Sequence, residues 1–244
     1  MGTVIAITSG KGGTGKTSIT GGTAASLALM GRCVLCIDMD VGLRNLDISL
    51  GLSDRALMDF SDVALGRCPL ARAAVSHPQL KSLSLLTAPM SLSPNLTADR
   101  IRALLDTART MYDYIFIDSP AGLGAGFRLA TGGADRVLVV ATNDASSLRD
   151  AQRTVGELSG IRQVHLVMNR IQPKLLRKLR TTIDDAMNAA GLPLIGVVPE
   201  DPQVMLCANQ GQPLTSQGHR GAAQACWNIA QRLEGRQVPI MHIR

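Results

Sequence analysis

The sequence predicts an α/β fold in which a mostly parallel sheet carries helices on both faces. Two observations predict it: short apolar runs alternate with helical stretches of ten or more residues, and these runs are apolar along most of their length. Alternation of this kind implies βαβ units. Parallel strands are buried on both faces, so they lack the polar alternation of half-exposed strands. Ligands of such folds bind at the carboxyl ends of the strands.

The first predicted strand, Thr3–Thr8, leads directly into a glycine-rich turn at Ser9–Thr17. Later strands are expected at Val34–Asp38, Leu83–Thr87, Tyr114–Asp118, Arg136–Ala141, Gln163–Met168 and Leu194–Val198. Helices are expected at Ser18–Met30, Thr97–Met111, Ser147–Ser159, Leu175–Ala190 and Ala222–Leu233.

Three helix ends carry start or stop signals. Gly31 ends the first helix, and Gly191 follows Ala190 at the end of another. Thr97 is expected to cap its helix, with Asp99 in the first turn. We find no repeat and no interdomain linker, so residues 1–244 are expected to form a single domain with a short tail at 235–244.

Composition excludes several classes of protein. The chain of 244 residues is 45% hydrophobic and 18% charged, which is too apolar for a disordered chain. Apolar runs such as Val137–Ala141 fall far below the ~18 residues of a membrane-spanning helix, and the N-terminus lacks the pattern of a secretory signal. Aromatic residues are only 2% of the chain, which argues against a base-stacking platform. A cytoplasmic protein with an aliphatic core is expected.

The charge balance suggests an anionic partner. A net charge of +6 and a pI near 9.4 fit a nucleotide, a nucleic acid or a membrane surface. The five cysteines do not suggest a disulfide framework. Cys33 and Cys36 form a C-x-x-C spacing, but they lie in a predicted buried strand, Cys33–Asp38, where residues three apart point to opposite faces. Core packing is therefore favoured over metal or redox chemistry.

The glycine-rich turn contains a phosphate-binding motif. Gly10–Thr17 satisfies G-x-x-x-x-G-K-[ST] between a predicted strand and a predicted helix, which is the context that this motif requires. Backbone N–H groups would surround phosphate oxygens, Lys16 would reach the β- and γ-phosphates, and Thr17 would ligate Mg²⁺. The fold is therefore expected to be of the P-loop NTPase type. The nucleotide-binding residues expected here are Lys11, Gly12, Gly13, Thr14, Gly15, Lys16, Thr17 and Ser18.

Carboxylates end two of the predicted strands. Asp38 and Asp40 follow the second strand, while Asp118 ends a later strand and precedes Ser119–Gly122. A P-loop ATPase needs acids to hold Mg²⁺ and to place the attacking water. Capping of strand ends is the alternative, and the neighbouring phosphate loop favours the functional interpretation. The expected metal set is Thr17, Asp40 and Asp118.

A second lysine, Lys11, lies near the start of the loop. The pattern K-G-G-x-G-K-[ST] at Lys11–Thr17 resembles the MinD/ParA family of deviant Walker A ATPases, so the single domain expected over residues 1–244 would be an ATPase domain of this family. The resemblance implies that Lys11 reaches across a dimer interface to the partner's phosphates. A cation supplied there would stabilise transition-state charge, as an arginine finger does.

Four further segments resemble the MinD branch of this family, so that the likeness extends from residue 2 to about 233. They are Asp38–Asp47, which matches a first switch of pattern D-x-D-x-G-L-R-N-L-D, Asp118–Gly122, Val197–Asp201 and Asn209–Pro213. The resemblance implies that Asp40 positions the attacking water, that Asn45 supports it and that Asp118 holds the Mg²⁺ shell. The implied catalytic set is Lys11, Lys16, Asp40, Asn45 and Asp118.

The resemblance also implies a base pocket. Asn169 falls where the family contacts adenine, and the residues implied to line the same pocket are Arg170, Pro199, Glu200 and Asp201.

The function implied is an ATP-hydrolysing switch, dependent on ATP and Mg²⁺, that dimerises on ATP and acts in the placement of the cell-division site. The partners implied are a MinC-like division inhibitor and a MinE-like activator. A ParA-like partition ATPase that binds DNA is the alternative. Reductase relatives carry cysteines near the second switch, and they are disfavoured because no cysteine lies between Cys68 and Cys207. Amide-forming synthetases are disfavoured because they are not expected to carry the segment Gly42–Asp47.

Two basic segments bear on localisation. The MinD branch ends in a basic amphipathic helix that binds membrane, whereas Gly235–Arg244 is short and contains Pro239. Either membrane binding is weak or absent, or this tail docks on a partner; the protein is expected in the cytoplasm or on the inner face of the membrane. Lys174–Arg180 is expected to be a solvated helix face with leucines packed below, and a surface for anionic lipid or DNA is the alternative.

Overall fold

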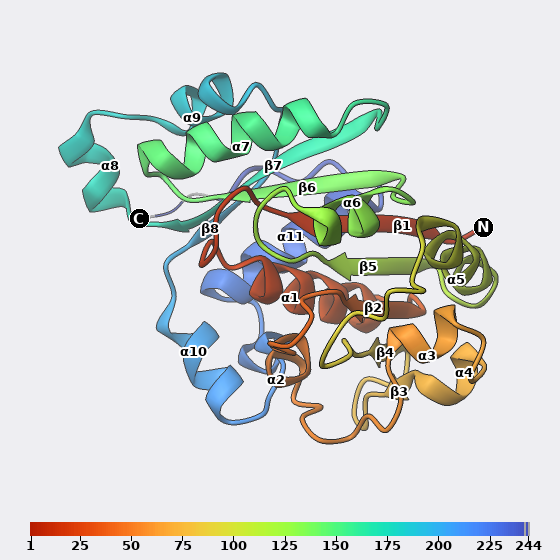
Figure 1. Ribbon diagram of the computed structural model, residues 1–244. Coiled ribbons are helices and arrows are strands. Elements are labelled where there is room, and N and C mark those ends of the chain that lie inside the picture. Colours follow the sequence, from red (N-terminus) through yellow and green to blue (C-terminus); the bar gives the residue numbers. More distant parts are fainter. Residues whose placement is uncertain (242, 244) are drawn as a thin grey trace.

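A computed structural model describes residues 1–241 and 243, and its centre is an eight-stranded sheet with the order β3-β4-β2-β5-β1-β6-β7-β8 (Figure 1). All neighbouring strands are parallel except β3 and β4, which are antiparallel at one edge. The strands are β1 (Thr3–Thr8), β2 (Val34–Asp38), β3 (Val75–Ser76), β4 (Leu83–Leu86), β5 (Tyr114–Asp118), β6 (Arg136–Ala141), β7 (Gln163–Ile171) and β8 (Leu194–Pro199).

Helices cover both faces of this sheet and enclose two apolar cores (Figure 1). One face is covered by α1 (Lys16–Leu29), α2 (Leu46–Leu50), α10 (Pro202–Asn209), η1 (Leu214–Gln217) and α11 (Gly221–Leu233). The other is covered by α3 (Phe60–Ala64), α4 (Leu70–Ala73), α5 (Ala98–Met111), α6 (Ala125–Thr131), α7 (Ala145–Glu157), α8 (Pro173–Leu179) and α9 (Ile183–Ala190). The predicted α/β architecture is confirmed.

Small residues let α1 and α11 pack closely against one another and against the sheet. A Cβ at Gly22 of α1 would lie 2.7 Å from Cys226 Sγ of α11, and a Cβ at Gly196 of β8 would clash with Ile229 Cγ1. Neither contact leaves space for a methyl group. This packing fixes α11 against the middle of α1, the helix that the phosphate loop precedes.

The predicted strand positions are confirmed, with small differences at three ends. β1, β2, β5 and β6 have the predicted bounds. β7 continues to Ile171 because Ile171 still pairs with Pro199 of β8 after a register shift. Thr97 accepts a hydrogen bond from the backbone N–H of Arg100, and Gly191 ends α9 in the left-handed region at φ 68°, so both predicted signals are confirmed.

The single helix predicted over Leu175–Ala190 is wrong. Two helices, α8 and α9, occupy this stretch. Arg180 ends α8 in the left-handed region at φ 52°, and the hydroxyl of Thr182 accepts a hydrogen bond from the backbone N–H of Asp185 as the N-cap of α9. Of the leucines predicted to pack beneath the basic face, Leu176 packs against the core as predicted, whereas Leu175 is 43% exposed and Leu179 is 50% exposed.

The interpretation of the C-x-x-C pair as core packing is wrong for one cysteine. β2 begins only at Val34, so Cys33 precedes the strand and is exposed, while Cys36 is buried within it. Both thiols are free. Within residues 1–241 and 243, no cluster of three or more His, Cys, Asp or Glu side chains could hold a metal ion.

The tail packs on the body of its own chain. Arg232 of α11 donates hydrogen bonds to the carbonyl oxygens of Val238 (2.9 Å) and Pro239 (2.7 Å), and to that of Ile195 in β8 (2.8 Å). Both outcomes expected for this tail, weak or absent membrane binding and docking on a partner, stay predictions. None of the helices in the described part of the chain has the length and apolar character needed to cross a membrane.

Candidate nucleotide site

The phosphate loop lies where the central strands end, at the amino end of α1. Ser9–Gly15 connects β1 to α1, and Gly15 precedes the helix as its N-cap at φ 89°. Gly13 is also left-handed, at φ 78°, and nothing lies within 4 Å of the place where its Cβ would be. Positive φ angles suit glycine and allow the backbone N–H groups to converge ahead of the helix. The loop therefore forms an open concavity suited to an anion.

We expect Gly15→Ala to destabilise the fold by about 2 kcal/mol or more, because the new Cβ would be strained by its positive φ and would clash with Asn169 Nδ2. Gly156→Ala, at an exposed position of α7 with open space around its Cβ, is the matched control and should stabilise by about 0.5–1 kcal/mol. Urea unfolding of both variants measures this difference; equal effects of the same sign would contradict the geometry of the loop.

Lys16 and Asp118 form the buried charged centre of the site. Lys16 is only 7% exposed. Burial lowers the pKa of its ammonium, and the charges of Asp118 and Asp40 oppose that effect. Since Lys16 starts α1 and Asp118 ends β5, a helix start and a strand end bring this pair together.

Asp118 is held by two hydroxyls of α1. Thr17 Oγ1 donates to Asp118 Oδ2 at 2.6 Å, and Thr20 Oγ1 donates to Oδ1 at 3.2 Å. Burial raises the pKa of Asp118 to about 7, against the hydrogen bond from Thr17. The predicted metal ligands Thr17 and Asp118 therefore lie side by side.

Asp38 shapes the loop that follows β2. It is buried and lies opposite Asp118 in the register of β2 and β5. Its carboxylate accepts hydrogen bonds from the backbone N–H groups of Asp40 (2.9 Å) and Leu46 (3.2 Å). Burial raises the pKa of Asp38 to about 6, although both N–H donors oppose the shift. The loop at 40–46 is thereby fixed at its two ends.

Asp40 lies half-buried near Lys16, and burial raises its pKa while the charge of Lys16 lowers it. Asp40 is thus brought to the site as predicted. Asn45, by contrast, is exposed at the start of α2, and no contact of its side chain with the phosphate loop is seen among the described residues. Its supporting role stays a prediction.

Lys11 points toward the start of α7. Its ammonium donates to Ser146 Oγ at 2.9 Å and pairs with Asp144 at 3.3 Å, and the side chain is 45% exposed. A cavity of about 310 Å³ lies beside it, between the phosphate loop, α7 and α8. In this conformation Lys11 is thus paired within its own chain.

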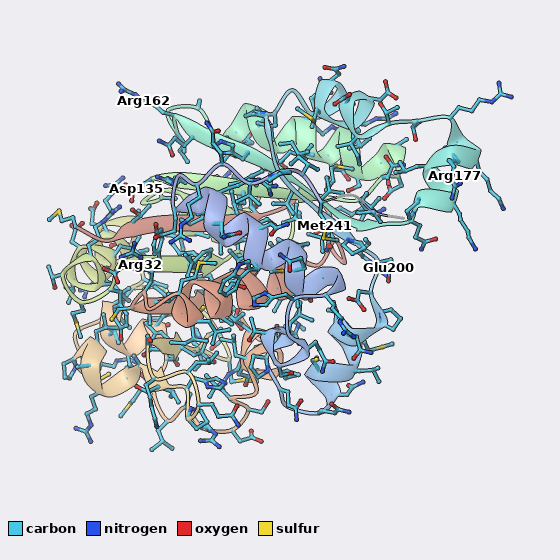
Figure 2. The ribbon with its side chains drawn as sticks, turned by 180° about the vertical axis from the view of Figure 1, so that it is seen from behind. Arg32, Asp135, Arg162, Arg177, Glu200 and Met241 are labelled. Atoms are coloured by element: carbon cyan, nitrogen blue, oxygen red, sulfur yellow. The ribbon has the colours of Figure 1, made fainter. Side chains whose placement is uncertain are left out.

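The residues predicted for the base pocket meet in a second cavity, of about 340 Å³. Asn169 Nδ2 donates to the carbonyl oxygen of Thr14 at 2.8 Å. Arg170, left-handed at φ 57°, forms two hydrogen bonds with Glu200, at 2.7 and 3.2 Å, and a third with the carbonyl of Gly13 at 3.4 Å. Figure 2 places Glu200 at this end of the sheet. The predicted members that line the cavity are Gly15, Ser18, Asn169, Arg170, Pro199, Glu200 and Asp201.

Sequence reasoning missed the apolar wall of this cavity. Its members come from α1, α10, η1 and α11: Ile19, Val204, Met205, Ala208, Leu214, Ala222 and Cys226. No motif marks them, because an apolar residue that lines a pocket has the same pattern as one in a core. The Asn209–Pro213 element, which connects α10 to η1, was the available signal.

The residues present fit a phosphate group and a divalent cation. Thr14 Oγ1 is buried and has no hydrogen-bond partner within the described part of the chain. An orphaned hydroxyl beside converging N–H groups suits a phosphate oxygen. The hydroxyl and carboxylate oxygens of Thr17, Asp118 and Asp40 are the hard donors that Mg²⁺ prefers.

Comparison with known proteins agrees with this geometry. The family model described as the CobQ/CobB/MinD/ParA nucleotide binding domain matches residues 5–214. The chain belongs to this family. Septum site-determining proteins MinD from Synechocystis and from Bacillus subtilis are each 37% identical to it, over 99% and 98% of this chain and 92% of each relative.

Solved structures of the MinD/ParA family have the same fold. A chain of the MinC:MinD cell division protein complex from Aquifex aeolicus superposes with a TM-score of 0.91 and 36% identity, covering 98% of this chain and 99% of that one. Septum site-determining MinD from Pyrococcus horikoshii, complexed with Mg-ADP, gives a TM-score of 0.83 at 27% identity, with 96% of both chains covered. The predicted fold class and resemblance are confirmed.

Proposed function

We propose that this member of the MinD/ParA family is an ATP-hydrolysing switch that dimerises on ATP and takes part in placing the cell-division site. The observation that carries the proposal is the match to septum site-determining proteins over nearly their whole length. The two-lysine loop, with Asp40 and Asp118 beside it, supports the catalytic part.

Each side chain has a definite task in this proposal. Lys16 neutralises the terminal phosphates, and Asp40 orients the water that attacks the γ-phosphate. Thr17, Asp118 and Asp40 would hold Mg²⁺, which when bound neutralises charge on the phosphate oxygens. The ligand named for the Pyrococcus relative, Mg-ADP, supports the choice of cofactors.

Dimerisation gives Lys11 its task. In the proposed ATP dimer, Lys11 leaves Asp144 and Ser146 and reaches the phosphates of the second subunit. Its exposed ion pair can break at little cost, because surface ion pairs contribute only about 0–1 kcal/mol. The ordering of the 40–46 loop by the γ-phosphate would make the dimer specific for ATP over ADP.

The proposal is tested by sedimentation velocity of the wild-type chain with Mg-ATP and with Mg-ADP, together with phosphate release. We expect a dimer with ATP, a monomer with ADP and steady hydrolysis of ATP. A monomer in both nucleotides would contradict the switch, and hydrolysis at the background rate would contradict the enzyme.

Lys11→Ala is expected to bind ATP with unchanged affinity and to lose the ATP-dependent dimer, because its ammonium would contact phosphates only across the interface. Lys174→Ala, which removes an exposed lysine from α8, is the charge-matched control and should dimerise normally. Sedimentation velocity at a fixed ATP concentration measures the dimer fraction. A normal dimer in Lys11→Ala would refute the role in trans.

The relative from Aquifex forms a complex with MinC, which supports a MinC-like division inhibitor as a partner of this chain. A MinE-like activator of hydrolysis is the second partner that we propose. The protein would act in the cytoplasm or on the inner face of the membrane.

A DNA-binding function is the second candidate, and one surface favours it. α8 and its C-cap present Lys174, Arg177, Lys178 and Arg180 to solvent, with Leu175 and Leu179 exposed between them. A gel-shift assay run beside liposome co-sedimentation, each with ATP and with ADP, separates the two targets. Retention of DNA that weakens with salt and needs ATP would favour partition; retention only by vesicles would favour division.

A further inference from the structure

A second polar hollow lies at the opposite edge of the sheet, where the strands begin. It has a volume of about 530 Å³ and is enclosed by the first residues of β5, β6, β7 and β8 and by the end of α11. Figure 2 shows this edge from behind, with Arg32, Asp135 and Arg162 along it. The nucleotide site is at the carboxyl ends of the same strands, so the two sites are separated by the length of the sheet.

Strand alternation explains why polar side chains face this hollow. Arg136 pairs with Gln163 and Leu138 pairs with His165 in the register of β6 and β7. Leu138 and Val167 lie in the core beneath α1 and α11, and residues two apart on a strand share a face. Arg136 and His165 therefore lie on the α11 side. α11 ends at Leu233, so these side chains remain beyond its cover.

Two arginines, Arg136 and Arg232, line the hollow, and neither is paired with a carboxylate of the described residues. Arg136 donates one hydrogen bond, to the carbonyl oxygen of Leu233 at 2.9 Å, and forms no ion pair with any described residue. Arg232 also lacks a carboxylate partner within the described chain, since its hydrogen bonds go to backbone carbonyls. Burial lowers the pKa of Arg232.

The one carboxylate among the described lining residues is already engaged. Glu234 accepts hydrogen bonds from Arg32 Nε at 3.0 Å and from the hydroxyl of Tyr114 at 2.6 Å. Its side chain is 8% exposed. Arg136 and Arg232 therefore line the hollow without a carboxylate partner among the described residues, and a partly buried charge that no counter-charge neutralises is costly.

His165 supplies a second unmet requirement. Its Nδ1 is buried and has no hydrogen-bond partner in the described part of the chain. Burial and the nearby charge of Arg136 lower the pKa of this imidazole. The charged or titratable groups that line the hollow with it are Tyr114 of β5, Arg136 of β6, and Arg232 and Glu234 at the end of α11.

We propose that this hollow is a second anion site, separate from the nucleotide site, which binds the phosphate group of a free phosphate or a small phosphomonoester. The guanidinium of Arg136 donates to the phosphate oxygens as a planar fork, and the imidazole of His165, which lines the same hollow, adds positive charge when it is protonated. Arg232 contributes charge but keeps its contacts with the backbone. The volume leaves space for a small organic group beside the phosphate.

The test is an NMR pH titration of the histidines of the full chain, with and without inorganic phosphate, at constant ionic strength maintained with chloride. His165→Gln identifies the signal of His165. We expect saturating phosphate to raise the pKa of His165 by about one unit, because the bound anion favours the imidazolium. A parallel titration with glycerol 3-phosphate distinguishes a phosphomonoester, which would act at lower concentration, from free phosphate.

Arg136→Gln should abolish the effect of phosphate on His165, and Arg136→Lys should keep a weakened effect, at about tenfold higher phosphate. Arg162→Gln removes an exposed arginine from the same edge and is the matched control, with a full response expected. ATP affinity should stay unchanged in all three variants, which separates this site from the nucleotide site. The proposal would be overturned if neither inorganic phosphate nor glycerol 3-phosphate changed the pKa of His165 in the wild type. It would also be overturned if phosphate raised this pKa equally in Arg136→Gln.

Discussion

Replacing Lys16 with alanine is expected to abolish ATP binding, with a loss of affinity of at least about 100-fold, or roughly 3 kcal/mol. Lys16 is the buried cation of the phosphate loop, at 7% exposure, and it lies close to two carboxylates, Asp118 and Asp40. Without its charge, a triphosphate would approach these carboxylates uncompensated. Repulsion is therefore added to the loss of a charge-assisted hydrogen bond.

The fold should tolerate this change. Burial lowers the pKa of Lys16, which means that the folded state pays a desolvation free energy to keep this ammonium charged. Alanine removes that unfavourable contribution. Isothermal titration calorimetry with Mg-ATP measures the affinity, and circular dichroism checks the fold. Lys81→Ala, which removes an exposed lysine of the loop before β4, should bind as the wild type does. Unchanged affinity in Lys16→Ala would refute the phosphate-loop assignment.

The sequence could predict the phosphate loop and its acids because these follow from local rules. A glycine pattern after an apolar strand determines where Lys16 lies, and strands that end in Asp38 and Asp118 meet at one edge when they are parallel neighbours. The register pairs Asp38 with Asp118, as that argument requires.

Features that depend on tertiary packing could not be predicted in this way. The break between α8 and α9 occurs at Arg180, which is left-handed although it is not a glycine, so the sequence carries no signal for it. The pairing of Lys11 with Asp144 joins residues that are far apart in sequence, across the start of α7. The uncovered start of β7, where His165 lies, depends on where α11 ends relative to the sheet.

Asp40→Ala is expected to reduce ATP hydrolysis by about 10²–10⁴-fold while ATP still binds, because the carboxylate that orients the attacking water is lost, whereas Lys16 and two of the three proposed Mg²⁺ ligands, Thr17 and Asp118, remain. The side chain of Asp40 makes no hydrogen bond with the described residues, whereas its backbone N–H is held by Asp38. The 40–46 loop should therefore keep its shape when the carboxylate is removed, and the free energy of unfolding should change by no more than about 0.5 kcal/mol.

A dimer that forms on ATP and is released by hydrolysis should accumulate in this variant. Single-turnover phosphate release measures the chemical step, and sedimentation velocity in Mg-ATP measures the dimer, which we expect to persist for hours. Glu157→Ala, at an exposed acid of α7, keeps the net charge equal to that of Asp40→Ala and should turn over normally. Wild-type turnover in Asp40→Ala would place the water-positioning group elsewhere. Loss of hydrolysis without a persistent dimer would contradict the proposed release step. The dimer would then dissociate without cleavage of the γ-phosphate.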